Sequence, residues 1–270
     1  MMLEQTDDDF QSVFFELAGD LRLYMLMKLS SKPYRLSQLA NELHATIQES
    51  HRNINRLIDS GFVKKTGDGD LVLTPYGKII VALIPNFNFP FIHKEYFQEH
   101  AVSNLPLKFI QRIGSLNNCE VVVGVMAVLQ RWKMVYNNSR MYIREIMSQV
   151  PIDLIETIAE RINNNVKFSY IFPNDVVIPK GRTELLKKLG WANMIFKGMV
   201  ERRLVDKVSI VIIFNENESC ISFPTLKGEP DLNIMFYSKD ESFHEWCEDF
   251  FSYEWTRSKQ FDESKLSPEI

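Results

Sequence analysis

The chain has few cysteines, and the three that it has lie far apart. Cys119, Cys220 and Cys247 form no CxxC pair, so the sequence supports neither a disulfide framework nor a zinc ribbon. A chain of this kind is typical of a reducing compartment, and we expect a cytoplasmic protein. We also expect no metal site, because no metal-ligand spacing joins these cysteines to His44, His93, His100 or His244.

Long apolar runs and a leader sequence are also missing. No stretch reaches the roughly 18 consecutive apolar residues that a membrane-spanning helix needs. The first ten residues, MMLEQTDDDF, are acidic and contain no apolar core, which excludes a secretory signal of the usual type. We therefore expect no membrane partner.

The short motifs of common catalytic sites are absent as well. The sequence contains no GxSxG, HExxH, P-loop or GxGxxG motif. We therefore predict that the protein is not an enzyme, that it has no catalytic residues and that it carries no cofactor.

Positive charge is scarce overall and is concentrated in one segment. The formal net charge is -4, which argues against a protein that coats nucleic acid indiscriminately. Between Leu21 and Ile80, however, nine Lys/Arg residues stand against five Asp/Glu residues. A local excess of this sign is expected of a segment that meets phosphate groups.

The length and composition predict two domains joined by a connector. With 270 residues, of which 45% are hydrophobic, the chain has enough apolar material for two cores. We predict a winged helix-turn-helix in residues 1–85, a helical connector in residues 86–117 and an α/β domain in residues 118–270. The fold class is therefore α+β, with an α/β second half.

Residues 10–83 have the order of elements found in winged helices. A helix over residues 10–29 is interrupted near Gly19, and a short helix follows that we expect Ser37 to cap. Thr46 and Glu49 have the spacing of a capping box at the start of a polar helix, residues 46–60, which ends at Gly61. Residues 62–73 then predict two strands joined by a Gly/Asp turn, the wing.

The helix over residues 46–60 is amphipathic. At 100° per residue, one sector of the helix about 100° wide forms the side expected to face the core. It consists of Ile47, Ser50, Ile54, Leu57 and Ile58. The opposite side carries Gln48, Glu49, Arg52, Asn55 and Arg56. His51 and Asn53 flank this side, and we predict that they also contact DNA. This pattern predicts a recognition helix in the major groove of double-stranded DNA.

Individual roles follow from the side-chain chemistry. Gln48 is suited to adenine and Arg52 to guanine, whereas Glu49 could accept from cytosine or serve the capping box. The remaining predicted contacts meet the DNA backbone, and they involve Asn55, Arg56, Lys64, Lys65 and the hydroxyl of Ser37. The alternative interpretation is a small helical bundle with a solvated polar face.

The second half alternates strands and helices. We predict strands at residues 119–125, 141–147, 166–172, 208–214 and 232–238, and a long final helix with an apolar stripe. Lys180 and Arg182 stand at the start of a predicted helix, where they could bind an anion. The alternative at this position is a solvated helix cap.

Two parts of the chain resemble known families. Residues 17–81, with LSQLANELHATIQESHRNINRLIDSGFVKK and LTPYGK, resemble archaeal winged-helix regulators of the ArsR-like kind. Residues 118–257, with VKFSYIFP, VSIVIIFNENESCISFP and FHEWCEDFFSYEWTRSKQF, resemble the effector domain of the methanogenesis-regulator-like family, related to the archaeal regulators of the TrmB type.

The resemblance implies a transcriptional regulator. It implies a homodimer on operator DNA and an α/β domain with a degenerate phospholipase-D-like fold that senses a small-molecule effector or dimerises. The HxKxxxxD motif of phospholipase-D enzymes does not occur, since neither His93 nor His244 starts it. Two alternatives remain open: a small-molecule-binding protein or enzyme that uses the winged helix for protein contacts, and a component of the basal transcription or repair apparatus.

Overall fold

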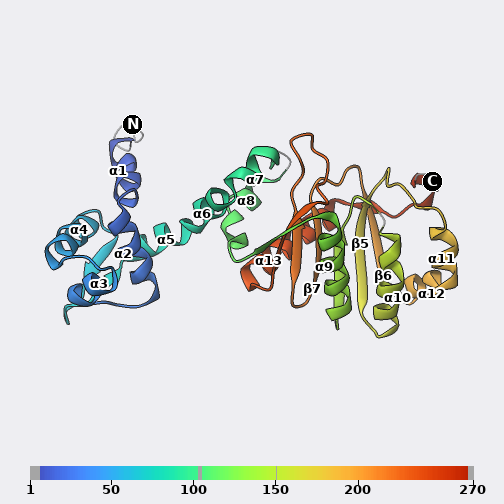
Figure 1. Cartoon of the computed structure of the whole chain (residues 1–270), viewed down its shortest axis with the longest axis horizontal. Coiled ribbons are helices and arrows are strands. Elements are labelled where there is room, and N and C mark those ends of the chain that lie inside the picture. Colours follow the sequence, from blue (N-terminus) through green and yellow to red (C-terminus); the bar gives the residue numbers. More distant parts are fainter. Residues whose placement is uncertain (1–6, 103–104, 150, 267–270) are drawn as a thin grey trace. The chain divides into compact units, whose positions relative to one another are not determined.

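The protein has a mixed α+β structure with one large sheet. The computed structural model describes residues 7–102, 105–149 and 151–266. The chain divides into two compact units between Phe87 and Asn88 (Figure 1). Each unit has its own apolar core. Among the described residues, no helix combines the length and apolar character needed to cross a membrane.

The N-terminal unit consists of helices and a two-stranded hairpin. Its elements are α1 (Asp7–Leu17), α2 (Asp20–Ser31), α3 (Leu36–Glu42), α4 (Ile47–Asp59), β1 (Val63–Lys65), β2 (Leu71–Leu73) and α5 (Pro75–Leu83). The predicted interruption at Gly19 is confirmed, because this residue separates α1 from α2. The helices and the hairpin close on one core that includes Met25, Leu26, Leu39, Leu57 and Phe62.

The hairpin and the helix ends form as the turn residues predict. Gly61 follows α4 with a φ of 77°, a conformation that glycine adopts without strain. The hairpin pairs Val63 with Leu73, and its turn is closed by Thr66, whose hydroxyl accepts from the amide of Asp70 at 3.1 Å. The Thr74 hydroxyl then caps α5 by accepting from the amide of Gly77 at 2.9 Å.

The second unit is built on an eight-stranded sheet. The strand order is β10-β6-β5-β4-β7-β8-β9-β3. Strands β4, β5 and β6 run parallel, and the other neighbours are antiparallel. The strands are β3 (Glu120–Val123), β4 (Tyr142–Ile146), β5 (Lys167–Pro173), β6 (Val200–Val205), β7 (Val211–Asn215), β8 (Ser219–Ser222), β9 (Ile234–Ser238) and β10 (Lys259–Gln260).

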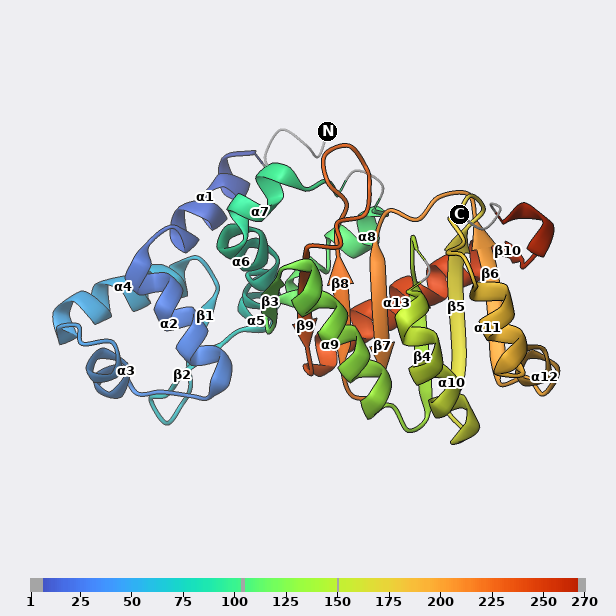
Figure 2. The same cartoon turned by 45° about the vertical axis from the view of Figure 1, so that its right-hand side comes forward.

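Helices cover both faces of this sheet. Figure 2 shows α9 and α10 on one face and α13 running across the other. All five residues of the central strand β7 are buried, as its nearly continuous apolar sequence predicts. Helix α6 (Pro85–Ile92) contains the boundary between the two units. The other helical segments of this unit are α7 (Lys94–Glu99), α8 (Leu107–Ile110), η1 (Ile113–Leu116), α9 (Val125–Asn138), η2 (Ile152–Leu154), α10 (Ile155–Asn163), α11 (Arg182–Lys188), α12 (Trp191–Phe196), α13 (Glu241–Arg257) and η3 (Glu263–Lys265).

Three local features go beyond the predicted elements. Pro85 begins α6, and Pro90 lies inside this helix. Strand β3 corresponds to the predicted strand at residues 119–125, but it is the last strand of the sheet, and only Val122 is buried. Strand β6 was not predicted at all, although it pairs along its length with β5.

Residues 88–116 also contribute to the large core. Phe89, Leu105, Phe109 and Leu116 are buried in the same cluster as the strands of the sheet. The Trp246 indole of α13 donates to the carbonyl of Phe109 at 3.1 Å. The segment therefore packs as part of the second unit.

Candidate nucleic-acid interface

Helix α4 begins at the predicted cap. The Thr46 hydroxyl accepts from the amide of Glu49 at 3.1 Å. The reciprocal bond of a capping box, from the Thr46 amide to the Glu49 carboxylate, is not found among the described contacts. The Glu49 side chain is exposed and is therefore not occupied by the cap.

The buried side of α4 differs from the predicted apolar sector. Ser50, Ile54 and Leu57 are buried as expected, but Ile47 is 53% exposed and Asn53 is buried. At the helical repeat, the buried sector is thus turned by about 40° from its predicted position, toward Asn53. The assignment of Ile47 to the core was wrong, and so was the assignment of Asn53 to the exposed flank.

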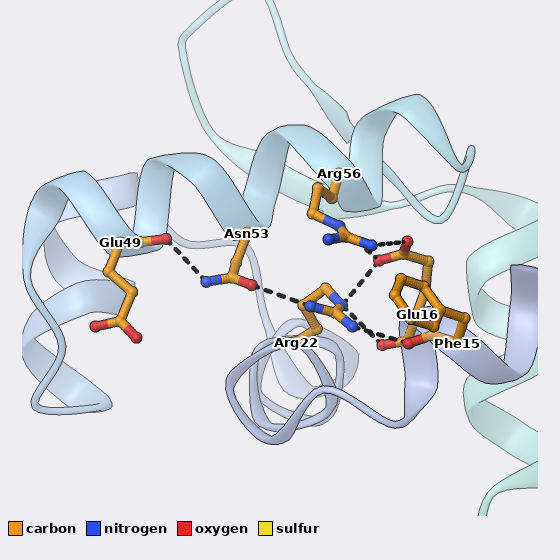
Figure 3. A network of polar contacts seen from close by, with 6 residues as sticks. All are labelled: Phe15, Glu16, Arg22, Glu49, Asn53 and Arg56. Carbon is orange, nitrogen blue, oxygen red and sulfur yellow. Dashed lines mark hydrogen bonds and ion pairs between the residues drawn. The ribbon is translucent and has the colours of Figure 1, made fainter.

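A polar network involving α1, α2 and α4 explains this rotation (Figure 3). The Glu16 carboxylate of α1 is almost fully buried and receives two bonds from the Arg56 guanidinium, at 2.6 and 3.2 Å. Arg22 of α2 lies 2.8 Å from the same carboxylate. It also donates to the carbonyl oxygens of Phe15, at 2.8 Å, and Glu16, at 2.9 Å.

Asn53 completes the network from the α4 side. Its side-chain oxygen accepts from Arg22 at 3.3 Å, and its amide donates to the carbonyl of Glu49 at 3.0 Å. Both functional groups of Asn53 therefore have partners inside the unit. Arg56 was expected to meet phosphate, but its guanidinium pairs with the Glu16 carboxylate. The hydrogen bond with Glu16 raises the pKa of Arg56, so the group stays charged with a partner inside the unit.

The remaining polar residues of α4 stay exposed. One side of the helix carries four of them, Gln48, His51, Arg52 and Asn55, which we call the exposed arc. The Asn55 amide lies 3.4 Å from Nδ1 of His51. Among the described residues, Arg52 forms no ion pair, in contrast to Arg56 one turn later. The exposed arc thus offers amide, imidazole and guanidinium groups from one rigid helix.

The hairpin presents further positive charge. Lys64 and Lys65 are exposed on β1, as expected for a wing. Arg35, which the sequence analysis missed, stands just before α3 and approaches Asp70 at the hairpin turn, with Nε and Oδ1 at 3.6 Å. Only the three-dimensional arrangement reveals this residue, since the linking bridge joins Tyr34 to Leu71.

Ser37 does not occupy the predicted position. Helix α3 begins at Leu36 with Arg35 as the preceding residue, so Ser37 lies inside the first turn and is not the cap. The backbone amide of Arg35 donates instead to the Gln38 side chain at 3.0 Å. Ser37 is exposed on the first turn of a short helix, beside Arg35.

The exposed side of α4 and the hairpin carries groups that can contact phosphate and hydrogen-bond to the edges of bases. Its exposed cationic groups are Arg35, Arg52, Lys64 and Lys65, and exposed carboxylates of Glu49, Asp59 and Asp68 lie on the same elements. The amide groups can both donate and accept hydrogen bonds. In residues 7–102, 105–149 and 151–266, no group of three or more His, Cys, Asp or Glu side chains could hold a metal ion.

Comparisons with known proteins give only distant likenesses. No protein-family model and no curated protein matches this chain. The chain is similar to the solved structure of TrmBL2, an archaeal chromatin protein with a novel mode of DNA binding. This likeness has 12% identity and a TM-score of 0.43, and it covers 93% of this chain and 99% of that chain.

Two further solved structures show weaker likenesses. Nuc, a phospholipase D family member from Salmonella typhimurium, has 11% identity over 54% of this chain and all of its own, 100%, with a TM-score of 0.40. The dimethyltransferase RosA from Streptomyces davawensis has 11% identity over 75% of this chain and 65% of its own, with a TM-score of 0.27. At these TM-scores, none of the likenesses carries an argument about what this protein binds.

Proposed function

We propose that the N-terminal unit is a winged helix-turn-helix that binds double-stranded DNA sequence-specifically. Helices α3 and α4 form the helix-turn-helix, and β1 and β2 form the wing. The observation that carries the proposal is the division of α4 into an anchored side and a free side. A recognition helix needs both, because base reading requires rigidly held side chains with unused hydrogen-bonding groups.

The proposed contacts follow from the exposed arc. Gln48 and Arg52 enter the major groove, where Gln48 pairs with adenine and Arg52 with guanine. His51 and Asn55 lie on the same arc and contact base edges or the adjoining backbone. Glu49 has a free carboxylate that suits the amino group of cytosine.

The backbone contacts come from the elements on either side of α4. Lys64 and Lys65 of the wing meet phosphate, and Arg35 and Ser37 at the start of α3 meet the strand beside it. Asn53 and Arg56 are left out of the proposed interface because Arg22 and Glu16 occupy them. In the proposed interface, the residues that hold α4 in place are therefore different from the residues that contact DNA.

The test is selection of bound duplexes from a random library with the full chain. We expect one enriched sequence, and we expect Arg52→Ala to weaken its binding and relax specificity at one base pair. Lys28→Ala serves as control, since Lys28 pairs with Glu42 on an exposed surface away from α4. Recovery of no enriched sequence by folded protein would overturn the proposal and favour a unit that contacts other proteins.

We further propose a transcriptional regulator of the archaeal type that acts as a homodimer in the cytoplasm and catalyses no reaction. Exposed aromatic side chains on α1 support the dimer, namely Phe10, Phe14 and Phe15. The second unit would sense an effector or dimerise, with a degenerate phospholipase-D-like fold. Sedimentation equilibrium tests the dimer: Phe14→Glu should shift the chain to monomer without unfolding it, and a wild-type monomer would contradict this part.

A further inference from the structure

A small cavity in the second unit is lined by polar groups as well as apolar ones. It lies between strands β4 and β5 of the sheet and helices α10, α11 and α12. Its floor contains Phe168, Tyr170 and Phe172, alternate residues of β5 that share one face. Glu145 of β4 lies directly beside Tyr170 in the register of the two strands.

Two hydrogen-bonding groups in this lining have no partner among the described residues. They are Nε of Arg182 and the indole nitrogen of Trp191, in residues that are 5% and 6% exposed. The buried Tyr170 hydroxyl beside them interacts with the Arg202 side chain and can still donate its own proton. Buried polar groups in proteins are normally hydrogen-bonded, so the unpaired donors around this cavity point to a ligand site.

Arg182 stands apart from other arginines of this unit. Several of those form ion pairs with a carboxylate, namely Arg112, Arg131, Arg144, Arg161 and Arg202. Arg182 is more buried than these, yet no ion pair of its guanidinium is found within the described chain. A buried guanidinium without an anion is unfavourable, because the interior does not replace the water that it loses.

We propose that this cavity binds the carboxylate group of a small molecule, with Arg182 as the counter-charge. The Trp191 indole and the Tyr170 hydroxyl donate to the same carboxylate. A single negative charge matches the single guanidinium, whereas phosphate would bring a second charge into an apolar site. The apolar lining from Ile155, Ile158 and Leu186 suits a hydrocarbon portion beside the charged group.

The neighbouring carboxyl is compatible with an anion. Burial raises the pKa of Glu145 to about 7, so this group takes up a proton near neutral pH and its repulsion of a second carboxylate falls. The Tyr136 hydroxyl also donates to Glu145, at 2.5 Å. Glu145 therefore has a fixed place at the edge of the site.

The cavity must widen to admit a carboxylate group. Its free volume is about 20 Å³, which accommodates about one water-sized group. Helix α11 carries Arg182 and lies between Gly181 and Gly190, both with positive φ. Glycine permits rotation at these two points with little strain, so an outward shift of α11 is the proposed route of entry.

The experiment uses the four tryptophans of the chain as reporters. The indole N–H signals of the full-length protein are recorded by NMR while sodium acetate is added at constant ionic strength set with sodium chloride. We expect a saturable downfield shift of the Trp191 signal, assigned with Trp191→Phe. The Trp246 signal should stay in place, because its indole already donates to Phe109.

Two variants separate the site from general salt effects. Arg182→Gln should weaken acetate binding about tenfold or more, since hydrogen bonds to charged groups are the strong ones. Lys187→Gln, in the same helix but on an exposed position, should bind as the wild type does. If Arg182→Gln does not fold, Tyr170→Phe provides the second test, with a smaller loss.

Three results would overturn the proposal. One is a Trp191 signal that does not respond to acetate. Another is an equal response to sodium phosphate and acetate, which would show a site without preference for carboxylates. The third is a strong cross-peak between the Trp191 indole and bound water that acetate leaves unchanged, which would show a buried water as the occupant. The test is independent of DNA binding, so failure of the proposed function leaves it intact.

Discussion

The two sides of α4 differ in whether their polar side chains have partners inside the N-terminal unit. On one side, Arg56 and Asn53 are tied to Glu16 and Arg22 by hydrogen bonds and ion pairs. On the other, Gln48, Arg52 and Asn55 are exposed. Arg52 and Arg56 are chemically identical and one helical turn apart, yet only Arg56 has an acidic partner. Their roles therefore depend on what packs against each side, and not on residue type.

The largest effect is expected at Glu16, the centre of the network that anchors one side of α4. Glu16→Ala removes the buried carboxylate and leaves Arg22 and Arg56 without a counter-charge. We expect a loss of about 3 kcal/mol in the stability of the N-terminal unit, at the lower end of the range for buried pairs because the Arg56 side chain is 40% exposed. Hydrogen exchange of α1 and α4 amides measures this loss without interference from the second unit.

Glu42→Ala is the matched control. Glu42 makes an equally short contact, 2.8 Å to Lys28, but both side chains are close to half exposed. Solvent screening leaves such pairs with little net effect, so exchange should not change. If the two variants behave alike, Glu16 does not anchor α4 and the division of the helix is wrong.

The free side is tested by a pair of arginine variants. Arg52→Ala should leave stability unchanged but weaken binding to the selected duplex by about 1–3 kcal/mol. Arg56→Ala should instead lower the stability of the unit, because it removes the contact with Glu16 and loosens α4. It should weaken DNA binding less than Arg52→Ala does. Calorimetric titration of both proteins with the selected and a scrambled duplex distinguishes the two outcomes. Equal loss of affinity in folded variants would show that Arg56 also reads DNA.

Local signals in the sequence were sufficient for much of this unit. The Thr46 cap, the end of α4 at Gly61 and the hairpin after Phe62 all depend on residues within a few positions of one another. The rotation of α4 could not be predicted in the same way. It depends on Glu16, which lies 40 positions before Arg56, and a helical repeat carries no information about which helix will pack beside it.

The second unit shows the same limit. Strand β7 was predicted because its residues are apolar on both faces, whereas β6 contains Glu201, Arg202 and Arg203 and does not look like a buried strand. Its place is set by pairing with β5 and β10. The residues that line the cavity around Arg182 also come from five separate elements. From the sequence, Arg182 stands at a helix start that could bind an anion or form a solvated cap, and nothing there indicates that its side chain is buried.

Gly19→Ala tests the geometry of the anchored side with a smaller perturbation. A methyl group at this position would lie 2.3 Å from the Arg22 guanidinium carbon, so Arg22 must move away from Glu16. We expect a loss of about 1 kcal/mol, because a flexible side chain can partly give way. Thermal unfolding measures it, and Gly67→Ala is the control, as a methyl group there meets nothing within 4 Å. Equal stability of both variants would mean that Arg22 holds its place without constraint from Gly19.

Lys65→Gln is expected to have the smallest effect, and it tests whether the wing belongs to the free side. Lys65 is exposed on β1, so its loss should not change stability. If it contacts one phosphate, affinity should fall about equally for the selected and the scrambled duplex, and the slope of log affinity against log salt should decrease by about one. Lys78→Gln, an exposed lysine of α5, should leave the slope unchanged. A phosphate contact carries no sequence information. A change in sequence specificity with Lys65→Gln would therefore mean that the hairpin contacts bases, and it would contradict the proposal that only α4 does so.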